Sequence, residues 1–190
     1  MPTPLTNEIE QSIAVLNSGG LLLYPTDTVW GLGCDATNTN AVATVFNAKQ
    51  RLTAKSLVIL VSDLGMLNDY VRHIRPEEME LLTQAEVPTT LIYHDPVGLA
   101  NLVVAQDNTV AIRIPKHDFC VNLIKRFGRP IVSTSANISG QVSPTSFKEI
   151  DPSILEASDY VVNLEREKDS KAASRILKVL KNGTVQVIRD

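Results

Sequence analysis

Residues 21–33, LLLYPTDTVWGLG, join an apolar run to a cluster of polar side chains. The first four residues have the length and composition of a buried strand. Pro25 ends the pairing of that strand because proline has no amide hydrogen to donate. Thr26, Asp27 and Thr28 follow, and then come Trp30 and a Gly-Leu-Gly sequence whose glycines are expected to permit a bend. Hydroxyls, a carboxylate and the only tryptophan of the chain thus gather where a strand ends.

The whole chain has the size and composition of an ordinary globular protein. It has 190 residues, of which 44% are hydrophobic and 21% are charged, so we expect a single domain that spans residues 1–190. The formal net charge of −3 argues against a protein that binds nucleic acid non-specifically. It does not argue against a local basic pocket.

Neither a targeting segment nor a membrane span is expected. The first ten residues, MPTPLTNEIE, are polar and acidic, and no apolar run approaches the roughly 20 residues of a membrane helix. Cys34 and Cys120 lie far apart without a CxxC motif, which is typical of a reduced cytosolic protein. We therefore expect a cytoplasmic protein without membrane contact.

Helical and strand patterns alternate along the chain. Helices are predicted from a cap at Thr6 to Gly19-Gly20, from a cap at Asn38 or Thr39 to a last turn with Lys49, from Ser62, from Pro76, and over 117–127 before Gly128. Strands are predicted at 21–24, 57–61, 89–94, 109–115 and 130–137, with a hairpin over 174–189 around Asn182-Gly183. This order predicts an α/β fold with a mixed sheet.

The common motifs for nucleotide and metal binding are absent from the sequence. It contains no GxxxxGK[ST] P-loop, no complete GxGxxG and no GxSxG. His73, His94 and His117 have no partner at metal-ligand spacing, so no metal site is predicted.

Polar residues instead gather at four places where apolar segments end. They are residues 26–28, the basic group Lys49, Arg51 and Lys55, Arg113 within an apolar strand, and Ser133, Ser135 and Asn137 at period two on one strand face. Open α/β sheets bind ligands beyond their strand ends, so these groups can line one anion-binding pocket. Arginine suits a bidentate carboxylate, and lysine suits phosphate.

Each group also has a purely structural explanation. The basic residues can form a solvated helix end, residues 26–28 can form a turn, and the serines can decorate a strand edge. Arg113 is harder to explain in this way, because a buried guanidinium needs a partner. Spacing and composition therefore indicate an anion-binding α/β domain and do not identify a reaction.

Three motifs together resemble a known family. YPTDTVWGLGCDA resembles P-T-[DE]-T-[VY]-[YW]-G-L-G, KQR followed by Lys55 resembles K-x-R with a further lysine, and STSANISG resembles an S-x-N motif. These motifs are similar, in the same order, to those of the YrdC/Sua5 family, the L-threonylcarbamoyladenylate synthases, in its short single-domain form. The resemblance implies a YrdC-like α/β domain: a twisted open mixed β-sheet flanked by helices, with a central anion-binding cavity.

The resemblance also implies a nucleotidyltransferase that makes threonylcarbamoyl-AMP and pyrophosphate from L-threonine, bicarbonate or carbon dioxide, and ATP. The threonine amine would capture carbon dioxide, and the carbamate oxygen would attack the α-phosphorus of ATP. A separate transferase complex would use the product for the N6-threonylcarbamoyl modification of adenosine 37 in tRNA. Mg²⁺ would enter with ATP, because the sequence offers no dedicated carboxylate cage.

The resemblance assigns roles to individual residues. The catalytic group would be Lys49, Arg51 and Lys55, facing the triphosphate and the carbamate. L-threonine would be bound by Thr26, Arg113, Ser133 and Ser174, with Arg113 on its carboxylate. The nucleotide would be bound by Thr109, Ser135, Asn137, Ser143 and Arg189. Trp30 would form a wall of the pocket, and Asp27 would orient the loop.

Two alternatives stay open at this point. One is a non-catalytic module of the same fold that binds double-stranded RNA or tRNA, although 5% aromatic content and a negative net charge do not favour it. The other is a paralogue with a different substrate. The intact basic and S-x-N motifs argue against such a paralogue, but they do not define the amino-acid pocket.

Overall fold

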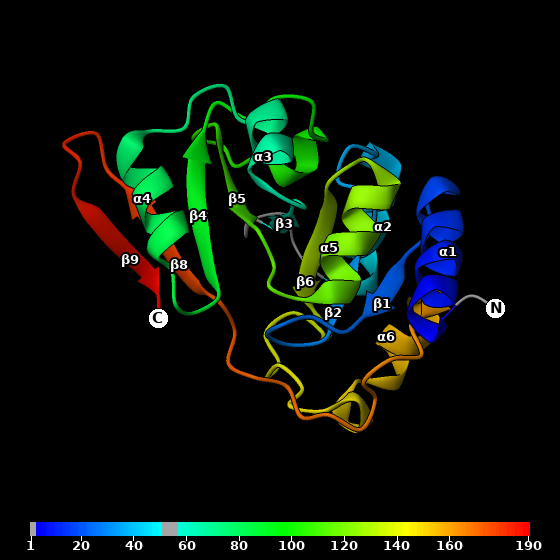
Figure 1. Cartoon of the computed structure of the whole chain (residues 1–190). Helices are drawn as coiled ribbons and strands as arrows, with labels where there is room; N and C mark the ends of the chain where they lie inside the picture. Colours follow the sequence, from blue (N-terminus) through cyan, green and yellow to red (C-terminus); the bar gives the residue numbers. More distant parts are fainter. Residues whose placement is uncertain (1–2, 51–56) are drawn as a thin grey trace.

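The computed structural model describes residues 3–50 and 57–190, in which helices and strands alternate (Figure 1). The helices are α1 (Pro4–Asn17), α2 (Thr39–Ala48), α3 (Leu64–Tyr70), α4 (Pro76–Gln84), α5 (Asp118–Phe127) and α6 (Pro152–Ala157). The strands are β1 (Leu22–Tyr24), β2 (Gly31–Gly33), β3 (Val58–Leu60), β4 (Thr89–His94), β5 (Thr109–Arg113), β6 (Ile131–Ser135), β7 (Tyr160–Val161), β8 (Arg175–Val179) and β9 (Val185–Arg189). Two 3-10 turns, η1 (Asn101–Val103) and η2 (Phe147–Glu149), complete this part of the chain.

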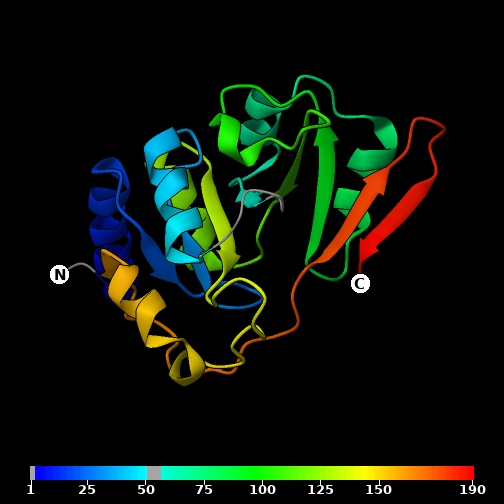
Figure 2. The same cartoon turned by 180° about the vertical axis from the view of Figure 1, so that it is seen from behind.

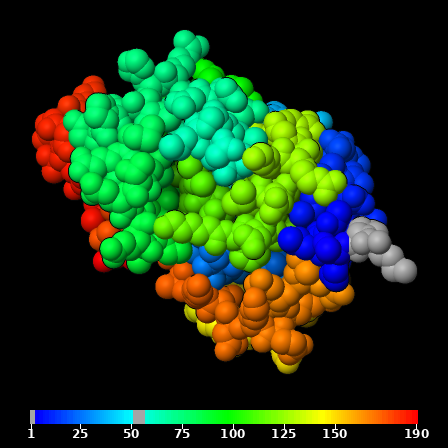
Figure 3. Space-filling view, in the orientation of Figure 1, coloured from blue at the N-terminus to red at the C-terminus, as the bar shows by residue number. Residues whose placement is uncertain are grey.

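Within the described residues, nine strands form one sheet in the order β7-β1-β2-β6-β3-β5-β4-β8-β9. Three neighbouring pairs, β1 with β7, β3 with β5 and β4 with β8, are parallel, and the others are antiparallel. The predicted mixed sheet is therefore confirmed. Helices α4, α3, α5 and α1 follow one another across the face seen in Figure 3, and α2 and α6 lie on the opposite side (Figure 2).

The apolar run that opens the quoted stretch is buried on both faces of the sheet. Residues 21–24 are fully buried. Leu22 and Tyr24 belong to the apolar cluster under α1 and α5, whereas Leu21 and Leu23 belong to the cluster under α2 and α6. Burying each leucine stabilises the fold by about 2 kcal/mol. The hairpin of β1 and β2 is therefore anchored in both halves of the core.

The Gly-Leu-Gly sequence forms strand β2, which corrects the expected bend. β2 pairs with β1 on one side and with β6 on the other. A Cβ atom at Gly33 would lie 1.9 Å from the carbonyl oxygen of Val132, and one at Gly31 would lie 3.1 Å from the Ser133 hydroxyl. Glycine is needed here because the neighbouring backbone approaches closely, and not because the chain turns.

Most of the predicted helix ends are confirmed by their caps. The Asn38 side chain accepts from the amides of the first turn of α2, and Gly128 ends α5 in the left-handed conformation. The terminal hairpin turns at Asn182, whose side chain accepts from the Thr184 amide. The predicted start of α1 was wrong by one turn: Thr3 is its cap, and its hydroxyl accepts from the Thr6 amide at 3.2 Å.

We predict that Gly33→Ala destabilises the protein by about 3 kcal/mol, because the new methyl group overlaps the β6 backbone and the strands must separate. Urea unfolding followed by circular dichroism measures this change. Gly65→Ala in α3 is the matched control, since its methyl group would meet only the Asp63 side chain, and it should change stability by at most about 1 kcal/mol. Equal stability of the two variants would contradict the close-approach argument.

Candidate active site

A cavity of about 450 Å³ lies among the ends of β2, β5 and β6, the loop after β6 and the β8–β9 hairpin. It is lined by Thr28, Val29, Gly31, Lys49, Val58, Arg113, Ser133, Thr134, Ser135, Asn137, Ser139, Gly140, Gln141, Ser143, Ala173, Ser174, Ile176 and Arg189. The segment that leads to β8 runs beside the loop after β6 (Figure 2), and the Ser170 amide donates to the Thr145 carbonyl at 2.6 Å. We call this space the main cavity.

The main cavity brings together most of the site residues predicted from the sequence. Eight of them line it: Lys49, Arg113, Ser133, Ser135, Asn137, Ser143, Ser174 and Arg189. Three of these are cations, and among the residues that the structure describes the lining contains no Asp or Glu. Cations and neutral donors without acidic side chains form a site for an anion.

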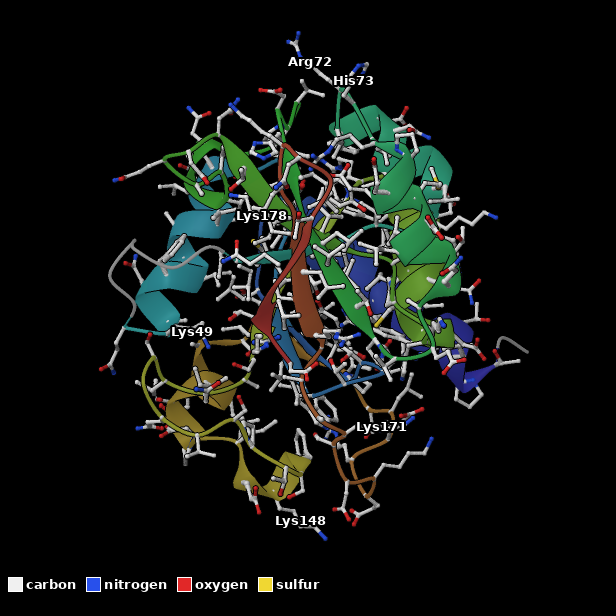
Figure 4. All side chains as sticks on the ribbon, turned by 90° about the vertical axis from the view of Figure 1, so that its left-hand side faces the viewer. Lys49, Arg72, His73, Lys148, Lys171 and Lys178 are labelled. Carbon is white, nitrogen blue, oxygen red and sulfur yellow. The ribbon has the colours of Figure 1, made fainter. Side chains whose placement is uncertain are left out.

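Lys49 joins α2 to the loop after β6. Its residue is 2% exposed, and its ammonium donates to the carbonyl oxygens of Ser135 at 2.5 Å and Asn137 at 2.6 Å. Its own carbonyl accepts from the Ser139 amide at 2.9 Å. Figure 4 shows Lys49 where α2 meets this loop. The buried positive charge therefore fixes the backbone of the S-x-N segment.

Arg113 ends β5 inside the cavity and has the partner that its burial requires. It is 3% exposed, and its Nη1 lies 2.5 Å from Oδ1 of Asp27, while Nη2 donates to the Thr28 hydroxyl at 3.3 Å. The second oxygen of Asp27 accepts from the Lys116 amide at 3.0 Å. Nε of Arg113 is buried without a hydrogen-bond partner in the described part of the chain. One edge of the guanidinium thus remains for an acceptor that the described residues do not supply.

Arg189 approaches from β9, at the far side of the main cavity. Its guanidinium donates to the Ser174 carbonyl at 2.7 and 3.0 Å, and Ser174 in turn shares a 2.8 Å hydrogen bond with Thr90. Partial burial, and then the positive charge of Arg113, lower the pKa of Arg189. A bound anion between the two arginines would remove that repulsion.

Asn137 shapes the loop and does not continue the strand face. β6 ends at Ser135, so the predicted period-two alignment of Ser133, Ser135 and Asn137 holds only for the two serines. The amide group of Asn137 donates to the carbonyls of Ile138 at 2.9 Å and Gln141 at 2.8 Å. Its Oδ1 is buried and lacks a partner among the described residues.

Two predicted residues lie away from the main cavity. Thr109 begins β5, and its hydroxyl donates to Asp107 at 2.6 Å. Strands rise roughly 3.3 Å per residue, so Thr109 lies roughly 13 Å along the strand from Arg113. Thr26 lines a second cavity, and its hydroxyl bonds to Thr28 and to the Val29 carbonyl. Arg51 and Lys55 lie outside the described residues.

Trp30 does not line the main cavity, which corrects the prediction for this residue. It lines the second cavity and packs against Phe147, with 4.8 Å between the ring centroids. The main cavity is also lined by three residues that were not predicted from the sequence: Thr134, Ser139 and Gln141. Their closeness to the S-x-N motif in the sequence could have indicated that they belong to the site.

The described residues offer no cage for a metal ion. No group of three or more His, Cys, Asp or Glu side chains among them is arranged to hold one. Burial raises the pKa of the Cys34 and Cys120 thiols. The two thiols are therefore protonated and unsuited to act as nucleophiles.

Comparisons with known proteins agree on one family. The Sua5/YciO/YrdC family model, described as "Telomere recombination", matches residues 14–190. The threonylcarbamoyl-AMP synthase of Stenotrophomonas maltophilia is 32% identical over 160 residues, 83% of this chain and 86% of that relative. That of Xylella fastidiosa is 33% identical over 158 residues, 82% of this chain and 83% of the relative.

Solved structures show the same fold. P. abyssi Sua5 complexed with L-threonine superimposes with a TM-score of 0.84 at 27% identity, covering 95% of this chain and 53% of Sua5, so the chain spans about half the length of that protein. E. coli YciO superimposes with a TM-score of 0.84 at 20% identity, covering 100% of this chain and 91% of YciO, a likeness of fold alone. Within residues 3–50 and 57–190, no helix has the length and apolar character needed to cross a membrane.

We predict that Asp27→Asn destabilises the protein by about 3 kcal/mol, because the buried Arg113 loses its counter-charge. Glu167→Gln is the control: it breaks the Lys148–Glu167 pair, whose side chains are 74% and 81% exposed, and it should leave the free energy of unfolding nearly unchanged. Urea unfolding of both variants measures the difference. A fully stable Asp27→Asn variant would show that the pair does not hold the cavity together.

Proposed function

Because the chain belongs to the Sua5/YciO/YrdC family, we propose that it is a threonylcarbamoyl-AMP synthase, which makes threonylcarbamoyl-AMP and pyrophosphate from L-threonine, bicarbonate or carbon dioxide, and ATP. The observation that carries the proposal is the main cavity, whose described lining brings Lys49, Arg113 and Arg189 together with seven hydroxyl side chains and contains no acidic residue. Such a cavity suits a substrate pair that carries a carboxylate and three phosphates.

L-Threonine binds with its carboxylate on Arg113. Nη1 is taken by Asp27, so the carboxylate uses the edge formed by Nε, which has no partner in the described chain, and Nη2. A carboxylate on these two atoms forms a bidentate pair. Ser133 and Ser174 line the same cavity and supply neutral donors to the amino acid.

ATP occupies the side of the cavity formed by the loop after β6. Lys49 holds the carbonyls of Ser135 and Asn137, so the nucleotide meets a loop whose backbone is already fixed. Arg189 stands opposite, where a phosphate between it and Arg113 relieves the repulsion that lowers the pKa of Arg189.

The chemistry requires positioning and charge stabilisation. The threonine amine takes up carbon dioxide to give a carbamate, and a carbamate oxygen attacks the α-phosphorus while pyrophosphate leaves. Fixed cations stabilise the charge that develops on the phosphate oxygens. The described residues place no strongly nucleophilic side chain in the main cavity, and this reaction needs none.

Mg²⁺ enters as the complex with ATP. The lining of the main cavity contains no carboxylate among the described residues, so a metal ion there takes its ligands from phosphate oxygens and water. Its contribution is to neutralise phosphate charge. Downstream, a separate transferase complex in the cytoplasm uses the product to modify adenosine 37 of tRNA.

The first test is pyrophosphate release from ATP by the purified protein with Mg²⁺ present. We expect release that requires both L-threonine and bicarbonate. Pyrophosphate release that is independent of both co-substrates, or no release from the folded protein, would contradict the synthase proposal. Either result would favour a module that binds RNA or another substrate.

We predict that Arg113→Lys lowers kcat/KM for L-threonine about 100-fold, because lysine keeps a charge beside Asp27 but lacks the bidentate fork. Arg126→Lys is the matched control, since Arg126 is 45% exposed and pairs with Glu10 on the surface, and its kinetics should equal those of the wild type. An Arg113→Lys variant with unchanged threonine kinetics would remove Arg113 from the carboxylate site.

A further inference from the structure

A second cavity of about 230 Å³ lies directly against the main one. Its walls are the loop of residues 25–30, residues 116–117 before α5, and residues 165–171 before β8. The two cavities share Thr28 and Val29 as lining residues. A molecule in the second cavity is therefore separated from the proposed threonine site only by the loop that carries Asp27.

Two buried polar atoms in this second lining have no hydrogen-bond partner within the described chain. They are Nδ1 of His117 and the hydroxyl oxygen of Ser170. An unpaired buried polar group destabilises a fold by about 1–3 kcal/mol. Such groups can be completed by a ligand, as proposed above for Nε of Arg113 in the main cavity.

Glu165 interacts with one ring nitrogen of His117 and thereby determines which nitrogen is left for a ligand. Nε2 of His117 lies 3.4 Å from one oxygen of Glu165, and the Lys168 ammonium lies 3.0 Å from the other. Burial raises the pKa of the Glu165 carboxyl, but Lys168 and His117 lower it further than burial raises it, so the carboxylate stays charged. The hydrogen bond to this carboxylate places a hydrogen on Nε2, so Nδ1 is the ring nitrogen that is left for a ligand.

The backbone at Glu165 is held in a costly conformation. Its φ angle is +56°, in the left-handed region that residues other than glycine rarely adopt. Strain of this kind persists where the surroundings fix it and often accompanies a functional site. Here the strained residue is the one that orients His117.

We propose that the second cavity binds bicarbonate, the one-carbon co-substrate, an inference that rests on the proposed synthase function. Bicarbonate carries one O–H donor, further acceptor oxygens and a single negative charge. Its O–H group donates to Nδ1 of His117, and an oxygen accepts from the Ser170 hydroxyl. The lining contains three lysines and three carboxylates. Asp27 is paired with Arg113 and Glu165 with Lys168, which leaves Lys171 and Lys116, whose ammonium donates to the Ala85 carbonyl at 2.8 Å, against Asp169. The lining therefore keeps a net positive charge.

The size and place of the cavity fit this ligand. Each molecule of liquid water occupies about 30 Å³, so 230 Å³ admits bicarbonate with several waters and excludes a nucleotide. The Lys171 amide donates to the Thr28 carbonyl at 2.7 Å, which ties the lysine segment to the shared loop. Bicarbonate held here lies one loop away from the threonine amine. Condensation of the two forms the carbamate C–N bond and releases one oxygen of bicarbonate as water.

The kinetic test uses pyrophosphate release with each substrate varied in turn. Ser170→Ala should raise the KM for bicarbonate about tenfold, the equivalent of one lost hydrogen bond to an anion. Lys171→Ala should raise it about fivefold. The KM values for ATP and L-threonine, and kcat at saturating bicarbonate, should stay within about twofold of the wild type. Unchanged KM for bicarbonate in both variants would overturn the proposal.

Matched controls come from residues that line neither cavity. Lys148→Ala removes a lysine that is 74% exposed, and Figure 4 shows Lys148 and Lys171 on separate segments at the same end of the molecule. Ser153→Ala removes a hydroxyl of α6 that bonds to Asp151. Both should leave the KM for bicarbonate unchanged, and a rise equal to that of the test variants would also reject the site.

A binding measurement separates this proposal from the proposed function. Carbon-13-labelled bicarbonate should show NMR line broadening with the wild-type protein and with Lys148→Ala, and clearly less with Ser170→Ala. No broadening with the wild type would overturn the bicarbonate site even if the synthase is active. Bicarbonate binding without threonine-dependent pyrophosphate release would support the site and reject the synthase.

Discussion

The buried ion pair between Arg113 and Asp27 is the interaction on which the arrangement of the site depends. A guanidinium that is 3% exposed needs a counter-charge, and Asp27 is the charge that the fold supplies. The pair links the end of β5 to the loop between β1 and β2, two segments 86 residues apart. Arg113 lines the main cavity and Asp27 lines the second, so one interaction forms part of both walls.

The loop that carries Asp27 is placed by the packing of the hairpin beneath it. β1 is buried on both faces, and β2 lies so close to β6 that a side chain at Gly33 has no room. β6 in turn delivers Ser133 and Ser135 to the cavity, and Lys49 holds the backbone just beyond it. Hydrophobic burial therefore sets the positions of polar groups that do not determine the fold themselves.

Local patterns in the sequence predicted most elements and the main group of site residues. The caps at Asn38 and Gly128, the terminal hairpin and the partner required by Arg113 all follow from short-range chemistry. The elements that were predicted wrongly or not at all depend on contacts between segments that are distant in the sequence. β2 pairs locally with β1, but its other partner is β6, about 100 residues later in the chain. β7 pairs with β1 over a still longer separation.

The division into two cavities was equally hidden, because it depends on which side of one loop each residue faces. Thr26 and Trp30 belong to the same motif as Thr28, yet they line the second cavity while Thr28 lines both. Sequence spacing cannot assign these sides, since residues 25–30 follow neither strand nor helix periodicity. Such a loop suits a reaction with three co-substrates, because the two sides of the loop can bind separate molecules. Thr28 lines both cavities, and the Arg113–Asp27 pair fixes the position of one side relative to the other. The geometry positions the reacting groups before any substrate binds, and positioning is the form of catalysis open to a cavity whose described lining holds no strongly nucleophilic side chain.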